Sequence, residues 1–294
     1  MSVSVLNLLK KESKVLADSA DKDAITPYSI DGITTNPTII CRGLSSNWLK
    51  DEPSIQNKSF EEIAVWIGSH LATLTSGQIS TQIDPHCAFD IDETIKKSCQ
   101  IIEMYQKQGV DASRILVKIP ATLEGLKAAQ KLEKDGIACN MTLVFHPTQA
   151  ILAADFGIHC VAPYVGRVTA WFQTHDKSNT SDVGSLQVAQ LKKYFLKNNY
   201  KTKIMAASFR SCEQILSLRG CDELTMAPKF LQELSQYSQE LPPRLIDTIE
   251  YKDFKKIKND SDFRFLFNES AMAVEKLCEG LRLFCKDTLI ISQQ

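Results

Sequence analysis

One lysine of the sequence stands where a charged side chain is costly. Lys118 lies inside a short apolar run from Ile115 to Pro120 that is typical of a β-strand, and Thr122 can cap the helix that follows at once. Because burial disfavours the charged form of an amine, a lysine inside a sheet must be paired or give up its proton. A neutral lysine amine attacks carbonyl carbon and forms a Schiff base. Taken alone, Lys118 is either such a nucleophile or a lysine at a solvated strand end, where most strand lysines lie.

The composition is that of an ordinary globular protein with a full apolar core. The chain has 294 residues, 44% hydrophobic and 23% charged, with a formal net charge of -1. This length suits one large domain, since α/β barrels commonly reach ~250 residues or more. No basic excess favours nucleic acid as a partner. The N-terminal charges follow a short apolar run, the reverse of a secretory signal, and no run approaches membrane-spanning length. We therefore expect a cytoplasmic protein that binds neither nucleic acid nor membrane, and leave open whether it forms a homo-oligomer.

Metal and redox chemistry are not favoured by the sequence. The nine cysteines form no CxxC pair and their number is odd, which predicts reduced, mostly buried thiols in a reducing compartment. The five histidines form no HxH or HExxH arrangement. We expect neither a metal site nor a cofactor.

Eight strand-like runs alternate with helical runs along the chain. Strands are expected at 14–19, 32–36, 78–84, 114–119, 138–144, 159–166, 202–208 and 223–228. Helices are expected within 46–76 and at 90–108, 122–134, 147–156, 186–198 and 211–218. Strand followed by helix, repeated eight times, is the pattern of an α/β (β/α)₈ barrel, or TIM barrel. We expect the barrel at about 14–240, within a single domain that spans 1–294.

Several of these helices carry an apolar stripe that should face the core. The stripes are Phe60, Ile63, Ile67 and Leu71 in the first helix, and Ile91, Ile95, Ile102 and Tyr105 in the second. A further helix is expected before the first strand. The residues from 241 to 294 predict a helical extension, whose last helix has the stripe Val274, Leu277, Cys278, Leu281 and Phe284.

Polar residues fall on the same side of the strands as Lys118. Alternate residues of a barrel strand point inward. By that rule the inward set includes Leu16, Asp18, Ser80, Gln82, Asp84, Asn140, Thr142, Ala162, Tyr164 and Gly166. A barrel filled only for stability would use branched apolar residues there. Any one polar residue is as readily explained as a satisfied group at a strand end. Their agreement over five strands predicts a site at the C-terminal ends of the strands.

Basic residues lie near the ends of two neighbouring strands. Arg167 is expected to close strand six, and Ser208 and Arg210 to close strand seven, where barrels tend to bind phosphate. A single arginine there is more often part of a surface ion pair. Two arginines and a serine at adjacent strand ends predict a phosphorylated substrate, held by bidentate contacts to its oxygens.

Long motifs occur in a fixed order over essentially the whole chain. They are DGITTNPT from Asp31, ISTQID from Ile79, RILVKIPAT from Arg114, CNMTLVF from Cys139, PYVGR from Pro163, MAASFR from Met205 and GCD from Gly220. Together they resemble transaldolases, the Schiff-base barrel enzymes of the pentose phosphate pathway. The resemblance implies that Lys118 forms the Schiff base and that Asp18 handles the proton of the hydroxyl at the cleaved bond. It also implies that Thr34, Asn36 and Asn140 contact the substrate, that Thr142 holds the catalytic water, and that Arg167, Ser208 and Arg210 bind the phosphate.

The sequence departs from the transaldolase pattern at two places. Gln82 replaces a glutamate, and Ala162-Pro-Tyr164 replaces Ser-Pro-Phe. Glutamine neither gains nor loses a proton at working pH, whereas a tyrosine hydroxyl can both donate and accept. Gln82, Ala162 and Tyr164 form the combination that fructose-6-phosphate aldolase, a shorter relative, carries. The resemblance therefore implies a transaldolase scaffold with an aldolase-like pocket.

The implied substrate is a ketose phosphate such as fructose 6-phosphate. Cleavage between C3 and C4 would leave a dihydroxyacetone enamine on the lysine. That enamine either adds to an aldose phosphate, which is transfer, or is protonated and hydrolysed, which is aldolase activity and is favoured by Tyr164. Two alternatives stay open: an ordinary transaldolase that tolerates both changes, and a catalytically silent paralogue that still binds sugar phosphate. A metal-dependent aldolase would need clustered histidines and is set aside.

Overall fold

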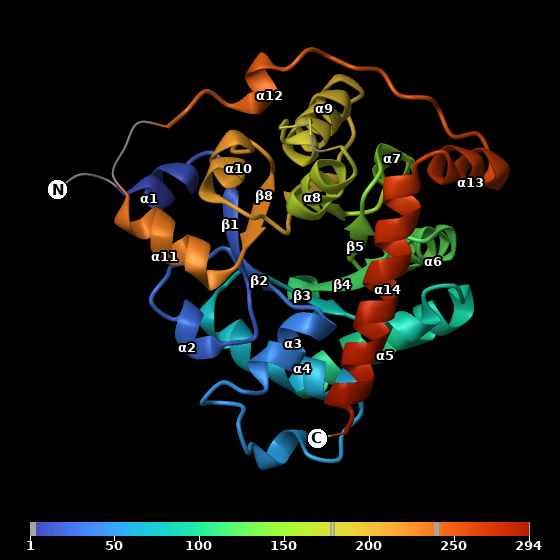
Figure 1. Cartoon of the computed structure of the whole chain (residues 1–294). Helices are drawn as coiled ribbons and strands as arrows, with labels where there is room; N and C mark the ends of the chain where they lie inside the picture. The colour runs from blue at the N-terminus through green and yellow to red at the C-terminus, as the bar shows by residue number, and fades with distance from the viewer. Residues whose placement is uncertain (1–3, 177, 179, 238–240, 294) are drawn as a thin grey trace.

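Eight parallel strands close into a barrel (Figure 1). The computed structural model describes residues 4–176, 178, 180–237 and 241–293. Its strands are β1 (Lys14–Asp18), β2 (Gly32–Thr34), β3 (Gln78–Gln82), β4 (Ile115–Pro120), β5 (Cys139–Val144), β6 (Cys160–Pro163), β7 (Lys203–Ala206) and β8 (Glu223–Met226). They pair in sequence order, and β8 pairs with β1 to close the ring. The prediction of a (β/α)₈ barrel is confirmed.

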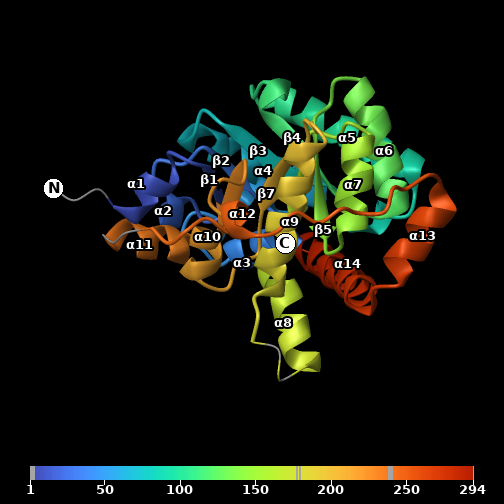
Figure 2. The same cartoon turned by 90° about the horizontal axis from the view of Figure 1, so that it is seen from above.

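Helices surround the barrel and start close to the ends of the strands. They are α1 (Val5–Leu9), α2 (Lys22–Ile25), α3 (Pro37–Gly43), α4 (Phe60–Leu71), α5 (Ile91–Lys107), α6 (Leu123–Lys134), α7 (Pro147–Asp155), α8 (Val165–His175), α9 (Val183–Lys197), α10 (Cys212–Ser217) and α11 (Pro228–Gln236). Thr122 caps α6 as predicted, since its hydroxyl accepts from the Gly125 N–H at 2.9 Å. The α8–α9 hairpin extends away from the body of the barrel in Figure 2.

Two apolar cores lie on the two faces of the strands. Ile79, Val117 and other outward residues pack against the helices, whereas Leu116, Met205 and other inward residues fill the barrel. This alternation follows from the period of two in a strand. Because Lys118 has the same parity as Leu116, its side chain belongs to the barrel interior, as the sequence predicts.

The last helix of the C-terminal extension crosses the end of the barrel at which the strands finish. The extension consists of α12 (Leu245–Thr248), α13 (Asp260–Asn268) and α14 (Ala271–Ile291), and α14, red in Figure 1, contacts α3, α4, α8 and β5. A Cβ at Gly280 would lie 2.6 Å from Leu143 Cδ2, so a larger residue there would force the Leu143 side chain to shift. Of the predicted stripe, Leu277, Leu281 and Phe284 are buried, while Val274 and Cys278 are half-buried. No helix among the described residues is long and apolar enough to cross a membrane.

Strand six is shorter than the sequence suggests. It ends at Pro163, and α8, a helix absent from the prediction, begins at Val165. Arg167 therefore lies in the first turn of α8 and does not close the strand. Ser208 likewise follows β7 in a loop, with a positive φ of 61°. These corrections leave both residues at the C-terminal end of the barrel, because a helix that follows a strand starts at that end.

The buried face of α5 is rotated from the predicted stripe. Tyr105 is buried as expected, but Ile91, Ile95 and Ile102 are only half-buried, and Thr94, Ser98 and Ile101 take the core positions. The two hydroxyls are satisfied locally: Thr94 donates to the Cys87 carbonyl at 2.9 Å, and Ser98 donates to the Thr94 carbonyl at 2.7 Å. Small hydroxyl residues with backbone partners can be buried at low cost, which apolar periodicity does not reveal.

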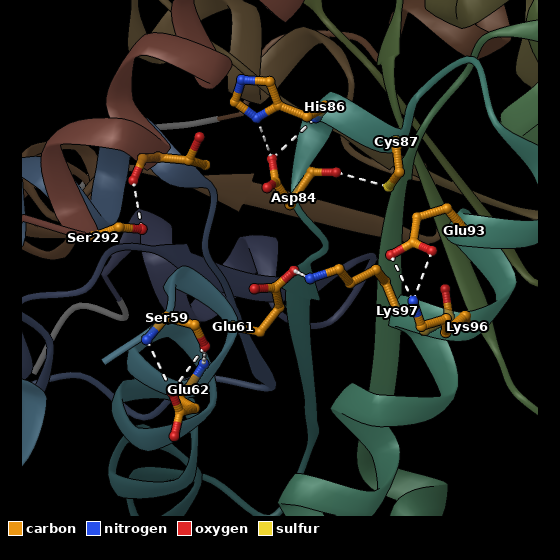
Figure 3. Close-up of polar contacts among 12 residues, drawn as sticks. Ser59, Glu61, Glu62, Asp84, His86, Cys87, Glu93, Lys96, Lys97 and Ser292 are labelled. Atoms are coloured by element: carbon orange, nitrogen blue, oxygen red, sulfur yellow. Dashed lines mark hydrogen bonds and ion pairs between the residues drawn. The ribbon is translucent and has the colours of Figure 1, made fainter. Parts of the chain in front are cut away.

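Asp84 turns away from the barrel interior, contrary to the parity rule. It caps the short 3₁₀ helix η3 (Pro85–Cys87) and accepts from the His86 N–H at 3.0 Å (Figure 3). The same carboxylate lies 2.7 Å from His86 Nδ1. The strand β3 has already ended at Gln82, so the inward alternation no longer applies at Asp84. Figure 3 also shows the Lys97–Glu61 ion pair, 2.9 Å long, which joins α5 to α4.

Candidate active site

Lys118 is buried inside the barrel without a carboxylate partner. Its side chain is 4% exposed, and its Nζ donates to the Thr35 carbonyl at 3.0 Å. The strand register sets Gln82 on one side of Lys118 and Asn140 on the other. Within the described residues, Lys118 takes part in no ion pair with an acid. The amine is thus held in place by a neutral acceptor.

Asp18 ends β1 and faces the same cavity. Its Oδ1 accepts from the Thr34 hydroxyl at 2.7 Å, and the Thr34 and Thr225 hydroxyl oxygens lie 2.6 Å apart. Although the cavity leaves part of the side chain accessible, burial raises the pKa of Asp18, and the positive charge of Lys118 and the Thr34 hydrogen bond oppose that rise. The net effect is a raised pKa, which brings Asp18 closer to the pKa range in which general bases work at neutral pH.

Amide and hydroxyl groups lie deep in the barrel beside the lysine. Gln82 is 1% exposed, and neither atom of its amide has a hydrogen-bond partner. Asn140 Nδ2 donates to Ser80 Oγ at 3.0 Å, but its Oδ1 has no partner. A buried amide without partners costs free energy, so these groups mark a place that a polar ligand would satisfy.

Tyr164 presents its hydroxyl to this group. The Thr142 and Tyr164 hydroxyl oxygens are 3.0 Å apart, so one donates to the other. The Tyr164 ring packs edge-on against Phe145, with the ring centroids 5.4 Å apart, and the Arg167 guanidinium carbon lies 5.3 Å from the Tyr164 centroid. Contacts on both sides fix the ring and therefore the position of the hydroxyl.

Arg167, Ser208 and Arg210 come together after β6 and β7. The Gly166 N–H donates to the Ser208 carbonyl at 3.0 Å. A Cβ at Gly166 would lie 2.5 Å from that carbonyl oxygen and 2.5 Å from Arg210 Cγ, so glycine allows the two loops to meet. Arg167 Nη1 is buried without a partner. Two arginines that form no ion pair among the described residues, together with a hydroxyl, suit an anion.

A hydrogen-bond network fixes the loop that carries Arg210. Gln214 accepts from the Arg210 backbone N–H at 2.9 Å and donates to Asp182 Oδ1 at 3.1 Å. Asp182, the N-cap of α9, also accepts from the hydroxyls of Thr169 in α8 and Ser185 in α9. Asp182 therefore links three helices to the loop after β7.

These residues share one cavity of about 440 Å³. Of the predicted site residues it is lined by Asp18, Thr34, Asn36, Lys118, Asn140, Ala162, Tyr164, Arg167, Ser208 and Arg210. Gln82 and Thr142 do not line it and lie behind the residues that do. A groove of about 490 Å³ between α13, α14 and residues 121–124 contains none of the predicted residues. We assign the site to the smaller cavity because the polar groups converge there.

Sequence reasoning missed several residues of the cavity. Arg42 and Lys229 add positive charge to the lining, and Thr38, Ile39, Thr225 and Leu283 complete parts of it. The parity rule applies to strands, whereas Arg42 and Lys229 lie on the helices that follow β2 and β8. Arg42 follows Thr38 by four residues and Ile39 by three along α3, which is the spacing of one helix face. Applying that spacing to the helix after β2 would have found Thr38, Ile39 and Arg42.

A closed parallel barrel with a buried lysine and a polar cavity at its C-terminal end is the architecture of the TIM-barrel enzymes. Residues 15–294 match the family described as Transaldolase/Fructose-6-phosphate aldolase. Transaldolase A of Escherichia coli K12 is 36% identical over 301 residues, which cover 96% of this chain and 95% of the relative. A transaldolase of Shewanella oneidensis is 36% identical over 303 residues, covering 97% and 95%. The chain belongs to the transaldolase/fructose-6-phosphate aldolase family and is an enzyme of the aldolase class.

Proposed function

We propose that this enzyme cleaves ketose phosphates such as fructose 6-phosphate through a Schiff base on Lys118, with a balance that favours release of dihydroxyacetone over its transfer. The observation that carries the proposal is the buried Lys118 amine, held by a backbone carbonyl and facing a cavity shared with Asp18 and Tyr164. Held by a neutral acceptor at the wall of the cavity, the amine is within reach of the carbonyl carbon of a bound sugar.

The first half of the reaction forms the Schiff base. Lys118 Nζ attacks the C2 carbonyl, and the carbinolamine loses water to give an iminium ion. The oxygen that leaves needs protons, which the Thr142 and Tyr164 hydroxyls are positioned to relay. Gln82 cannot supply a proton, but its unpartnered amide can orient the departing water.

The second half breaks the bond between C3 and C4. Asp18 removes the proton of the C4 hydroxyl, the bond electrons move to the iminium nitrogen, and an aldose phosphate leaves. A three-carbon enamine then remains on Lys118. The raised pKa of Asp18 suits this role, because a base with a higher pKa binds the transferred proton more strongly.

The remaining polar residues orient the sugar. Asn36 accepts from the Ile39 N–H through its side-chain oxygen at 3.0 Å, which leaves its NH₂ group to donate to a substrate hydroxyl. The Asn140 side-chain oxygen, which has no partner, can accept from another substrate hydroxyl. Thr34 donates to Asp18 and fixes its carboxylate. Ala162 has a small side chain and lines the cavity beside Tyr164. Arg167, Ser208 and Arg210 bind the phosphate.

The fate of the enamine decides between lyase and transferase. A hydroxyl that protonates the enamine carbon leads to dihydroxyacetone, which hydrolysis of the Schiff base then releases. Tyr164 is 5% exposed, lines the cavity and contacts Thr142, which supports that role. An ordinary transaldolase is the second candidate, because the relatives with 36% identity are transaldolases by name. A cytoplasmic location stays a prediction, and whether the chain forms a homo-oligomer stays open.

Two assays run in parallel test the proposal. One measures release of dihydroxyacetone from fructose 6-phosphate, and the other measures transfer of the three-carbon unit to erythrose 4-phosphate. We expect both activities, with release the faster. Transfer without release would contradict the proposed balance and support the ordinary transaldolase. Neither activity, with fructose 6-phosphate still bound, would support the silent paralogue.

A further inference from the structure

Thr225 lines the active-site cavity, but no step of the proposed reaction uses it. It lies in β8, is 3% exposed, and has its hydroxyl oxygen 2.6 Å from that of Thr34. The strand pairing explains this contact. In the parallel register β1 sets Leu16 beside Thr225 of β8, and Asp18 beside Thr34 of β2. Side chains from the two strands that flank β1 therefore meet inside the barrel, next to the carboxylate of Asp18.

The direction of both hydrogen bonds follows from the protons available. An ionised carboxylate has none, so Thr34 donates its single hydroxyl proton to Asp18 Oδ1, at 2.7 Å. The Thr34 oxygen is then left as an acceptor, and Thr225 is the donor across the 2.6 Å contact. The three groups form a chain in which Thr225 donates to Thr34 and Thr34 donates to Asp18.

The chain leaves one oxygen of Asp18 for the reaction. Oδ1 accepts from Thr34, whereas no residue that the structure describes bonds Oδ2. Asp18 is half-buried and lines the cavity, so a sugar hydroxyl can reach Oδ2. When the C4 hydroxyl gives up its proton, the new O–H bond forms at Oδ2. The Oδ1 atom stays an acceptor in the carboxylic acid, so the bond from Thr34 persists through the step.

A hydroxyl whose own oxygen accepts a hydrogen bond is a stronger donor, because the two bonds polarise each other. The bond from Thr34 favours the ionised carboxylate and opposes the rise that burial causes in the pKa of Asp18. The charged groups around Asp18 are Lys118 of β4, Arg167 of α8 and Arg42 of α3, which also lower its pKa, and Arg210 and Lys229, which line the same cavity. All of them stay unchanged when Thr225 is replaced.

Building on the proposed function, we propose that Thr225 is a positioning residue, which acts through the Thr34 hydroxyl to orient Asp18 and hold it ready to accept the C4 hydroxyl proton. The effect of Thr225 depends on Thr34, since Thr34 carries the only link between the two ends of the chain. A threonine that merely filled the lining would act independently of the Thr34 hydroxyl.

Carbon NMR titration of the aspartate carboxyl groups tests the chain without substrate, with Asp18→Asn used to assign the Asp18 signal. Thr225→Val, which keeps the shape and removes the hydroxyl, should move the Asp18 midpoint to higher pH by about half a pH unit. Thr225→Ser, which keeps the hydroxyl, should titrate like the native chain. In a Thr34→Val background, Thr225→Val should cause no further shift. An unchanged midpoint in Thr225→Val, or an equal shift with and without the Thr34 hydroxyl, would overturn the proposal.

The pH profile of fructose 6-phosphate cleavage gives a second arm. Thr225→Val should move the acid limb of kcat/KM to higher pH and lower kcat by about 5–10-fold with little change in KM, and Thr225→Ser should restore both. Thr225→Ala, which also lacks the hydroxyl but packs differently, should behave like the valine variant. A fall in rate that is equal at every pH would indicate altered packing and contradict the proposal.

A control removes a buried threonine hydroxyl from the other end of the barrel. Thr202, just before β7, has a buried Oγ1 with no hydrogen-bond partner among the described residues, so Thr202→Val should keep the native titration and pH profile. Since the titration needs no turnover, failure of the proposed activity would leave the first arm intact. Normal cleavage together with a native Asp18 midpoint in Thr225→Val would overturn the role of Thr225 and leave the proposed function standing.

Discussion

The two ends of the barrel use buried charges in opposite ways. At the N-terminal ends of the strands, Glu223 is almost fully buried but lies 3.6 Å from Lys203, and Lys192 lies 2.6 Å from Asp222. At the C-terminal ends, Lys118 and Asp18 face one cavity and form no ion pair among the described residues. Paired charges satisfy one another and stabilise the fold, whereas unpaired ones remain available to a substrate.

Carboxylates at the strand starts also accept backbone hydrogen bonds. Asp222 accepts from the Ile204 N–H at 2.9 Å, and Glu133 accepts from the N–H groups of Cys139 and His159 at 2.8 and 2.7 Å. These carboxylates tie strand starts to neighbouring elements. The amide of Gln82, at the other end, has no partner at all. At the strand starts Glu223 Oε2 and Thr202 Oγ1 are likewise buried without a hydrogen-bond partner among the described residues, so Gln82 is distinguished by its place beside Lys118.

The largest expected contrast comes from removing one lysine at each end. Lys118→Met should reduce cleavage by at least ~10⁴-fold, because the nucleophile is lost, and should leave the free energy of unfolding unchanged or higher. Lys203→Met should leave activity intact but destabilise the fold by roughly 1–2 kcal/mol, a value reduced because Lys203 is about one-third exposed. Activity assays and urea unfolding of both variants check this. Equal loss of activity in the two variants would contradict the proposed difference between the two ends of the barrel.

Replacing one carboxylate at each end should separate chemistry from packing. Asp18→Asn should lower cleavage by about 10²–10⁴-fold, since the general base is lost, and Glu223→Gln should not.

The pKa of Asp18 is raised in the folded state, so the folded protein holds this proton more tightly than the unfolded chain. The protonated carboxyl is therefore the form that favours folding at low pH, and this stability is lost as pH rises through the raised pKa. Asp18→Asn should accordingly raise the melting temperature more at pH 7 than at pH 4. The reverse order would contradict burial as the main cause of the raised pKa.

The role of the Tyr164 hydroxyl is tested by a smaller change. Tyr164→Phe should slow dihydroxyacetone release by about 10–10²-fold and affect transfer less, because only release needs a proton on the enamine carbon, whereas both paths end with hydrolysis of a Schiff base. Tyr105→Phe is the matched control, since Tyr105 is also buried and bonded to a threonine hydroxyl, but in the outer layer. The ratio of release to transfer is the measurement, and an unchanged ratio in Tyr164→Phe would remove the argument for aldolase-like balance.

The smallest expected effect concerns the network behind Arg210. Gln214→Ala should raise the KM for fructose 6-phosphate by about 5–10-fold, equivalent to one lost hydrogen bond, with little change in kcat. Cleavage of unphosphorylated fructose should not respond. Gln187→Ala serves as the control, because Gln187 bonds to the Phe145 carbonyl and not to the Arg210 loop. Parallel effects on both substrates would indicate general disruption of the α8–α9 hairpin.

The sequence predicted the barrel and the inward position of Lys118 because strand periodicity is a local property. It placed Thr122 as a cap and Phe60, Ile63, Ile67 and Leu71 in the core for the same reason. Its errors lie where tertiary contacts decide. Arg167 lies in a helix whose first turn meets the loop after β7 at Gly166, and Asp84 left the inward set once β3 had ended.

Residues on helices were the hardest to assign to the site. Arg42 and Lys229 reach the cavity from α3 and α11, and Leu283 reaches it from α14, far away in the sequence. The position of α14 depends on contacts such as that between Gly280 and Leu143, which no local pattern encodes. The chemistry of the cavity could be predicted from the strand ends, but its charge could not.

Borohydride reduction in the presence of fructose 6-phosphate tests the central claim most directly. Peptide mapping by mass spectrometry should then locate a reduced three-carbon adduct on Lys118, and on none of the other lysines. Asp18→Asn should accumulate the uncleaved six-carbon adduct at the same residue, since Schiff-base formation precedes the step that needs the base. An adduct on another lysine, or no adduct while substrate binds, would contradict the account.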